Sequence, residues 1–307
     1  MTKKVEDLEQ RLKKYAWEIS GYLNQKTNRD MKAQLSAFAL TMLNVHVNMG
    51  FVFTAKCPED YLIQLMELRE EMNLVVSSIY SDKFTTDTWM ELLGVLSIRL
   101  KHFMEFIGRC YGLDLDMQIA MPFAVPDGIS DLVLDLDVPE PLPRLSADKP
   151  IGEQSMEVLM VFKGYFDELF DYIFRKSGQD WHVPLAILIL PLIELHRIMM
   201  VVLEDICPDL LQAHGEALET ILREVMKFFR GKAKPGKDEV TRLFDMIAYR
   251  LKNFLEFLAL CLGEDLVLKV EIGEGGAPQI SIVRYGPLPS LPLQGSQEGG
   301  EDHGREG

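Results

Sequence analysis

Three ionisable side chains fall inside apolar helical stripes in the first half of the chain. Glu18 lies between Tyr15 and Tyr22, and His46 and Arg99 likewise stand among apolar residues at spacings of three and four. This spacing places each of them on the inward face of its helix. Because an unpaired charge is very costly in a protein interior, a buried Arg99 needs a partner. We therefore predict a Glu18–Arg99 ion pair, with His46 or a tyrosine hydroxyl completing a polar cluster.

The same residue types return about 150 residues later in the chain. Glu168, His196 and Arg250 repeat the ionisable set, and Tyr165 and Tyr172 repeat the tyrosines. We expect a second cluster in which Glu168, Arg250 and His196 contact one another. Each cluster could be a structural network that fixes the register of its helices. It could also be a small pocket for an anionic ligand, with the arginine and the histidine as the cationic end.

Four cysteines form a second set of candidate functional residues. Cys57 precedes a helix and Cys110 ends one, and Cys207 and Cys261 repeat these two positions. In an up-down bundle each pair falls at one end, where it could act as a redox pair, or all four could bind zinc across a twofold axis. The spacing is unlike CxxC, and small buried cysteines are the simpler interpretation. We name no cofactor, with zinc as the one candidate.

Other catalytic patterns are missing from the sequence. No pair of Glu-x-x-His motifs is present for a di-iron site, and GEGGAP (residues 273–278) lacks the helix and lysine that follow a phosphate-binding loop. No Ser, His and Asp set is legible. The sequence therefore predicts no catalytic residue and favours binding over turnover.

The elements that position these residues occur twice. Residues 99–114 read RLKHFMEFIGRCYGLD and residues 250–265 read RLKNFLEFLALCLGED, at an offset of 151. Earlier matches, such as Cys57-Pro58 and Cys207-Pro208, have an offset of 150, and the extra residue falls in a loop. The pattern indicates a tandem duplication.

Each copy reads as four helices followed by a β-hairpin, so the fold class is mainly α with a minor α+β part. Short turns between helices predict an up-down four-helix bundle in each copy, and two copies pack most simply about a pseudo-twofold axis. The expected domains are a first repeat at 1–138, a proline-rich linker at 139–153, a second repeat at 154–286 and a disordered acidic tail at 287–307. The expected hairpins pair 115–121 with 131–138 and 267–272 with 279–285.

The bulk composition excludes some classes of protein. A formal net charge of −15 argues against binding to nucleic acid and is compatible with a basic protein partner. Residues 183–203 are long and apolar enough to cross a membrane, but Glu194, His196 and Arg197 interrupt them, so we expect no membrane span. The charged N-terminus and the cysteine pattern are typical of a cytoplasmic protein.

Together these patterns predict a non-catalytic binding protein, used as an adaptor or scaffold for another protein and built as a pseudo-dimer within one chain. The alternative is a sensor or carrier of a small anionic ligand that uses the Arg/His/Glu pocket. A further alternative is a cysteine-based redox or zinc-binding protein.

Overall fold

The computed structural model describes residues 3–115, 145–146, 148–231, 236–272 and 278–288. Helices account for 78% of these residues, and a two-stranded antiparallel sheet completes the described part, so the expected mainly helical class is confirmed. The elements are α1 (Lys3–Lys26), α2 (Met31–Lys56), α3 (Pro58–Ile79), α4 (Thr86–Cys110), α5 (Ile151–Lys176), α6 (His182–Leu203), α7 (Pro208–Phe229), α8 (Lys237–Cys261), β1 (Glu264–Ile272) and β2 (Pro278–Pro287).

Local chemistry explains where several helices begin and end. The Asp30 carboxylate caps α2 by accepting a hydrogen bond of 3.0 Å from the Ala33 N–H. Pro58 stands in the first turn of α3, where its missing N–H is not needed. Gly112 and Gly263 follow α4 and α8 with φ of 75° and 77°, a conformation that stops a helix and that glycine adopts without strain.

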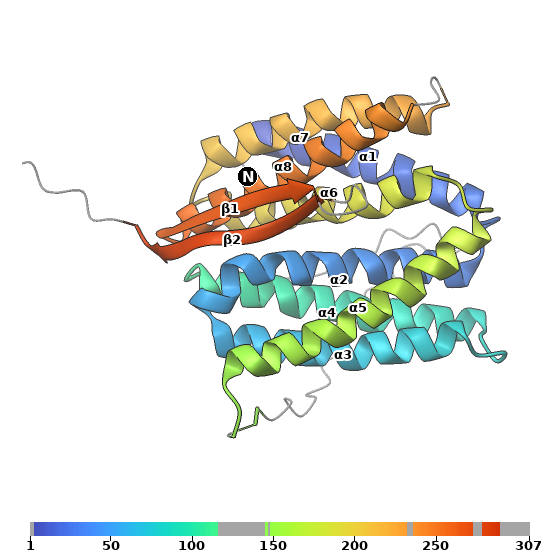
Figure 1. Ribbon diagram of the computed structural model, residues 1–307, viewed down its shortest axis with the longest axis horizontal. Coiled ribbons are helices and arrows are strands. Elements are labelled where there is room, and N and C mark those ends of the chain that lie inside the picture. The colour runs from blue at the N-terminus through green and yellow to red at the C-terminus, as the bar shows by residue number, and fades with distance from the viewer. Residues whose placement is uncertain (1–2, 116–144, 147, 232–235, 273–277, 289–307) are drawn as a thin grey trace, which may run out of the picture.

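The first helix of each half packs against the other half of the chain. α1 lies against α6 and α7, and α5 lies against α2 and α3 (Figure 1). The helices therefore form two groups, one of α2 to α5 and one of α1 with α6 to α8. The sequence predicts that α1 packs with α2 to α4 and that α5 packs with α6 to α8. This assignment of the first helix to each bundle was wrong.

The apolar stripes explain why either arrangement satisfies the sequence. Leu8, Leu12 and Ile19 of α1 are fully buried, and so are Leu169 and Ile173 of α5 to within 1%. A stripe of this kind determines which face of a helix is buried, but not which neighbour covers it. The turns at 27–30 and 177–181 are short, yet they direct each first helix away from the helix that follows it.

The most apolar helices, α2 and α6, lie at the centre and contact each other. By length and composition alone both could cross a membrane, and 56% and 78% of their apolar windows are buried inside the fold. A buried core helix passes the same test, so this finding is weak. The polar interruptions of α6 have partners here, since Arg197 pairs with Glu194 and with Glu9 of α1.

The hairpin expected after the second set of helices is present. β1 and β2 pair antiparallel from Glu264 opposite Pro287 to Ile272 opposite Pro278, with a register shift between Val267 and Leu268. β1 packs along α8. The first expected hairpin, much of the linker and nearly all of the expected tail lie outside the described residues.

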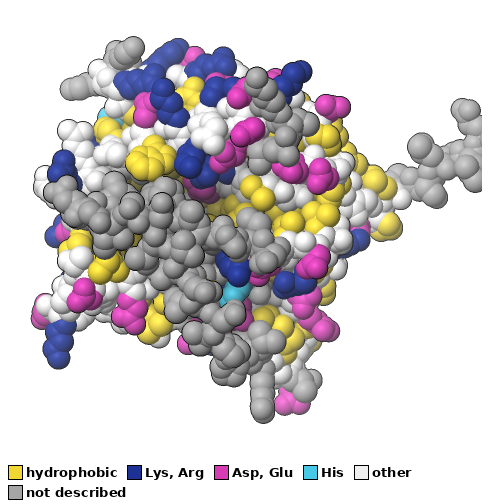
Figure 2. Space-filling view, turned by 180° about the vertical axis from the view of Figure 1, so that it is seen from behind, with side chains coloured by type: hydrophobic (Ala, Val, Ile, Leu, Met, Phe, Trp, Pro, Cys, Tyr) yellow, Lys and Arg dark blue, Asp and Glu magenta, His cyan; other side chains and the backbone are white. Residues whose placement is uncertain are grey.

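Charged side chains of both signs are interspersed on the face shown in Figure 2, with hydrophobic side chains between them. No single-sign field covers the visible part of this face, as a surface for nucleic acid would require.

Candidate functional site

The buried Arg99 of α4 is fully paired, but with α3 rather than with α1. Its Nε donates to Oε1 of Glu71 at 2.8 Å, and its Nη1 forms an ion pair with Glu67 and donates to Oε1 of Gln64 at 3.4 Å. The Arg99 side chain is only 4% exposed. Two carboxylates and an amide therefore neutralise and solvate this guanidinium within the protein.

The predicted Glu18–Arg99 pair was wrong. Glu18 of α1 instead accepts from Nη2 of Arg230 at 2.8 Å, because α1 packs against the second half of the chain. The second predicted cluster was wrong in the same way. Glu168 is exposed, and its backbone carbonyl accepts a hydrogen bond of 3.4 Å from the Tyr80 hydroxyl.

The two central histidines are buried, neutral members of the core. His46 Nδ1 donates to the carbonyl oxygen of Met42 at 2.8 Å, and its ring stacks on Phe103 at 3.6 Å. His196 has the same environment, with Leu192 and Phe254 as its partners. Burial lowers the pKa of His46 to about 3 and the pKa of His196 well below its usual value. Neither ring carries a positive charge at neutral pH.

Two of the predicted tyrosines join the halves rather than an arginine cluster. The Tyr22 hydroxyl donates to Asp180 at 2.9 Å, and the Tyr172 hydroxyl donates to Asp30 at 3.3 Å. Asp180 stands two residues before the start of α6, and Asp30 stands directly before α2. The other two predicted tyrosines are half-buried against the core: Tyr15 and Tyr165.

Arg250 of α8, the counterpart of Arg99, has no carboxylate partner among the described residues. Its Nη2 donates to Nδ1 of His214, and its Nε is buried without a hydrogen-bond partner there. Arg250 is 8% exposed, and burial lowers its pKa to about 10. Burial, together with the nearby guanidinium, lowers the pKa of His214 to about 4, so this ring is a neutral acceptor.

The difference between the two arginines follows from the sequence of α7. At the offset of 150 residues, Ala217 and Ile221 stand where α3 has Glu67 and Glu71. Both carboxylates that neutralise Arg99 are thus replaced by apolar side chains beside Arg250. A buried guanidinium without a counter-ion is unfavourable, and carboxylates and phosphates are the acceptors that suit its geometry.

A pocket of about 350 Å³ opens over Arg250. This volume is at the lower end of the range of small-molecule sites. The two replaced positions form part of its wall from α7, and α8 supplies the rest. The other lining residues, besides Ala217, Ile221 and Arg250, are Arg242, Asp245, Met246, Tyr249 and Asn253.

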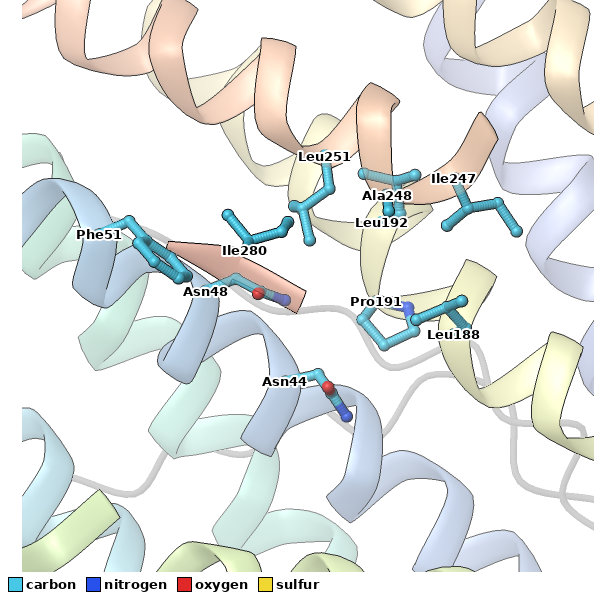
Figure 3. Close-up of a pocket in the computed structure, with 10 residues that line it drawn as sticks. All are labelled: Asn44, Asn48, Phe51, Leu188, Pro191, Leu192, Ile247, Ala248, Leu251 and Ile280. Atoms are coloured by element: carbon cyan, nitrogen blue, oxygen red, sulfur yellow. The ribbon is translucent and has the colours of Figure 1, made fainter. Parts of the chain in front are cut away.

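A second pocket, of about 230 Å³, lies between α2, α6, α8 and β2, where the two groups of helices meet (Figure 3). Its side chains are mostly apolar, including Phe51, Pro191 and Ile280. The amide of Asn44 already donates to the Leu40 carbonyl at 2.8 Å. This pocket offers no charged group to orient a ligand, so it is the weaker candidate.

The four cysteines form two separate pairs rather than one cluster. Cys57 and Cys110 form a disulfide with a Cα–Cα distance of 6.5 Å, and Cys261 donates to Cys207 with 2.7 Å between the sulfur atoms. The described residues contain no group of three or more potential metal ligands. The four-cysteine zinc site was therefore wrong, because each pair stays within its own group of helices. The interpretation as small buried cysteines was also wrong for Cys57 and Cys110, which are half-buried and bonded to each other.

Comparison of the chain with family models, with curated proteins and with solved structures found no match. Its function must therefore be inferred from the geometry of the Arg250 pocket.

The sequence contained a pattern, not used above, that indicates the partners of Arg99. Gln64, Glu67 and Glu71 share one face of α3 at spacings of three and four, inside its buried stripe. A comparison of the two copies at those positions would have shown the loss of both carboxylates. His214 and the pocket residues of α8 carry no such pattern.

Proposed function

We propose that the chain arose by tandem duplication, that its two units exchange their first helices, and that the second unit binds a small anionic ligand at Arg250. Reciprocal contacts support the exchange, since Tyr22 of α1 bonds Asp180 while Tyr172 of α5 bonds Asp30. The corresponding lysines pair with the same carboxylates, Lys26 with Asp180 and Lys176 with Asp30.

One observation carries the binding function: Arg250 lies buried and positively charged at the wall of a pocket, and no carboxylate of the described residues neutralises it. Its counterpart, Arg99, shows which chemistry the guanidinium accepts, because Nε and Nη1 of Arg99 bind carboxylate oxygens. A ligand carboxylate or phosphate would take the place of the carboxylates that α7 lacks. Such charge-assisted hydrogen bonds are stronger than those between neutral groups.

The arrangement supports binding without turnover. His214 accepts a hydrogen bond from Arg250, and its lowered pKa leaves it unprotonated at neutral pH, so it orients the guanidinium rather than supplying a proton. The ligand is held by one fixed cation and by the apolar wall of Ala217 and Ile221. This is the chemistry of a sensor or a carrier.

Thermal denaturation with sodium acetate or sodium phosphate, against sodium chloride at equal ionic strength, tests the proposal. We expect the melting temperature of the protein to rise with the concentration of the binding anion, because the anion stabilises only the folded state. The rise should vanish in Arg250→Met. It should persist in Arg230→Met, which removes a half-exposed arginine that Glu18 already pairs. Equal shifts in both variants would show non-specific salt effects and refute the site.

A protein partner, the leading expectation from the sequence, is the second candidate. Large apolar side chains are exposed on two elements, with Met156 and Met160 of α5 at 60% and 65% and Ile282 and Val283 of β2 at 53% and 63%. A β-strand with such side chains can accept an extended peptide of a partner. Loss of co-purifying protein in Ile282→Lys with Val283→Lys, and not in Met156→Lys, would support the strand as the contact.

A further inference from the structure

We propose that the ligand of the Arg250 pocket is a small zwitterion, whose carboxylate binds Arg250 and whose protonated amine binds Asp245. This inference rests on the proposed function and specifies the class of ligand. It accounts for a second buried polar atom in the same pocket, Oδ1 of Asp245, which a simple anion would leave without a hydrogen bond.

Asp245 lines the pocket from α8. Its Oδ1 is buried and accepts no hydrogen bond within the described part of the chain. A buried acceptor without a donor is unfavourable, and so is the buried donor Nε of Arg250, which also lacks a partner there. One ligand that carries both an acceptor and a donor would satisfy both atoms.

The positions of the two groups on α8 allow a single small molecule to reach both. Arg250 follows Asp245 by five positions on α8, which corresponds to a rise of roughly 7.5 Å and a rotation of roughly 140° about the helix axis. Long helical side chains lean towards the N-terminus of their helix, so the guanidinium extends from Arg250 in the direction of Asp245. Both side chains line one pocket of about 350 Å³, which has room for an amino acid or a short ω-amino acid.

The counterparts in the first half support the pairing of the two features. At the offset of 151 residues, Gly94 of α4 stands where α8 has Asp245. The half whose arginine is neutralised internally therefore lacks this carboxylate, and the half with the open arginine has it.

The charges around the pocket favour a zwitterion over a plain anion. A ligand with a second negative group would lie close to the Asp245 carboxylate and be repelled. The only other charged side chain that lines the pocket in the described residues is Arg242, which is exposed at the rim. Met246 and Ile221 give the body of the ligand an apolar contact.

Isothermal titration calorimetry at pH 7 with matched ligands tests the proposal on the full chain. The pairs are glycine with acetate and 4-aminobutyrate with butyrate, because the members of each pair differ only in the amino group. Butylamine and inorganic phosphate complete the panel. We expect at least one amino acid to bind roughly tenfold or more tightly than its deaminated partner, the effect of a hydrogen bond to a charged group.

Two variants assign the groups. Asp245→Asn keeps the shape of the side chain, so it should abolish the preference for the amino acid while carboxylate binding remains. Arg250→Met should abolish the binding of both members of a pair. If acetate, butyrate or phosphate binds at Arg250 as tightly as the amino acids, the zwitterion is refuted and the anion site stands. If no probe binds, or butylamine binds as tightly as 4-aminobutyrate, both proposals fail.

Discussion

The Tyr22 hydroxyl lies 2.9 Å from Oδ2 of Asp180, although 158 residues separate the two in the chain. The Tyr172 hydroxyl makes the matching contact with Asp30 across 142 residues. Each tyrosine stands near the end of a first helix, and each carboxylate precedes the central helix of the other half of the chain. These contacts fasten α1 and α5 to helices far from them in sequence.

Replacement of Asp180 by alanine should weaken the attachment of α1. Asp180 accepts hydrogen bonds from Tyr22, from the backbone N–H and ring of His182, and from Lys26 in an ion pair. We expect Asp180→Ala to lower the free energy of unfolding by about 1–3 kcal/mol, because these partners lose their acceptor. Urea denaturation at pH 7 measures the change.

Asp171→Ala is the matched control for this substitution. Asp171 is exposed on α5, and Arg175, one turn away, is its one ion-pair partner in the part of the chain that the structure describes. Its removal should change the free energy of unfolding by less than about 0.5 kcal/mol. Equal losses in the two variants would mean that Asp180 does not fasten α1.

Stability should fall as the pH is lowered from about 6.5 to 4, because two buried histidines and the half-buried His214 resist protonation. Burial lowers the pKa of His46 to about 3 and of His214 to about 4, and the pKa of His196 lies well below its usual value. In this range the unfolded chain binds protons that the native protein does not, so the free energy of unfolding rises with pH. Each histidine contributes a slope of about 1.4 kcal/mol per pH unit.

His214→Gln tests this slope. Glutamine is chosen because Gln64 stands at the corresponding position in the first half of the chain. The variant should lose the contribution of one proton between pH 6 and pH 4, while its stability above pH 7 changes little. The measurement is a series of urea denaturations across this range. An unchanged slope would mean that His214 is protonated in the native state.

The two buried arginines should respond in opposite ways to replacement by methionine. Arg99→Met leaves Glu67 and Glu71 without their counter-ion, so we expect a loss of about 3–5 kcal/mol. Arg250→Met removes a charge that no described carboxylate pairs, so stability without ligand should be unchanged or higher by about 1 kcal/mol. Denaturation of both variants with guanidinium chloride measures the difference in their free energies of unfolding. Similar losses in both would show that Arg250 is compensated.

The Cys57–Cys110 disulfide should stabilise the first group of helices. We expect Cys57→Ser with Cys110→Ser to lower the free energy of unfolding by about 2–4 kcal/mol, since the cross-link restricts the unfolded chain. The matched change, Cys207→Ser with Cys261→Ser, should cost less because that pair is not cross-linked. Thiol titration of the denatured wild-type protein should find the free cysteines of this second pair alone.

Sequence periodicity predicted the helices and the second hairpin well, because these depend on local spacing, caps and turn residues. Pro58, Gly112 and Gly263 mark boundaries that the structure keeps. The prediction of which apolar residues of α1 and α4 face inward was also correct. Local spacing carries no information on which distant helix covers such a face, and for this reason the partner of Glu18 was predicted wrongly.

The candidate site was predictable only in part. Arg250 was identified because it repeats Arg99, and its burial follows from the stripe on which it lies. The prediction that both repeats form the same cluster failed because it considered only residues that are the same in both repeats. The function proposed here depends on residues that differ, namely Ala217 and Ile221 in place of Glu67 and Glu71. When a sequence pattern repeats along a chain, a lost partner is as informative as a retained residue.

A single substitution should convert the second half to the state of the first. In Ile221→Glu a carboxylate returns to the position of Glu71, whose Oε1 accepts from Nε of Arg99. We expect the new carboxylate to bind Nε of Arg250 in the same way. The free energy of unfolding without ligand should then rise by about 1–3 kcal/mol, because a buried donor gains a charged acceptor.

The same variant should no longer bind an external anion, since its own side chain occupies the site. Thermal denaturation of Ile221→Glu with acetate or phosphate should show no rise beyond that of chloride. Ile221→Gln has nearly the same shape without the charge, and it should gain less stability and keep part of the response to anions. If Ile221→Glu is destabilised and still responds fully, the carboxylate does not reach Arg250, and the equivalence of the two arginine sites is refuted.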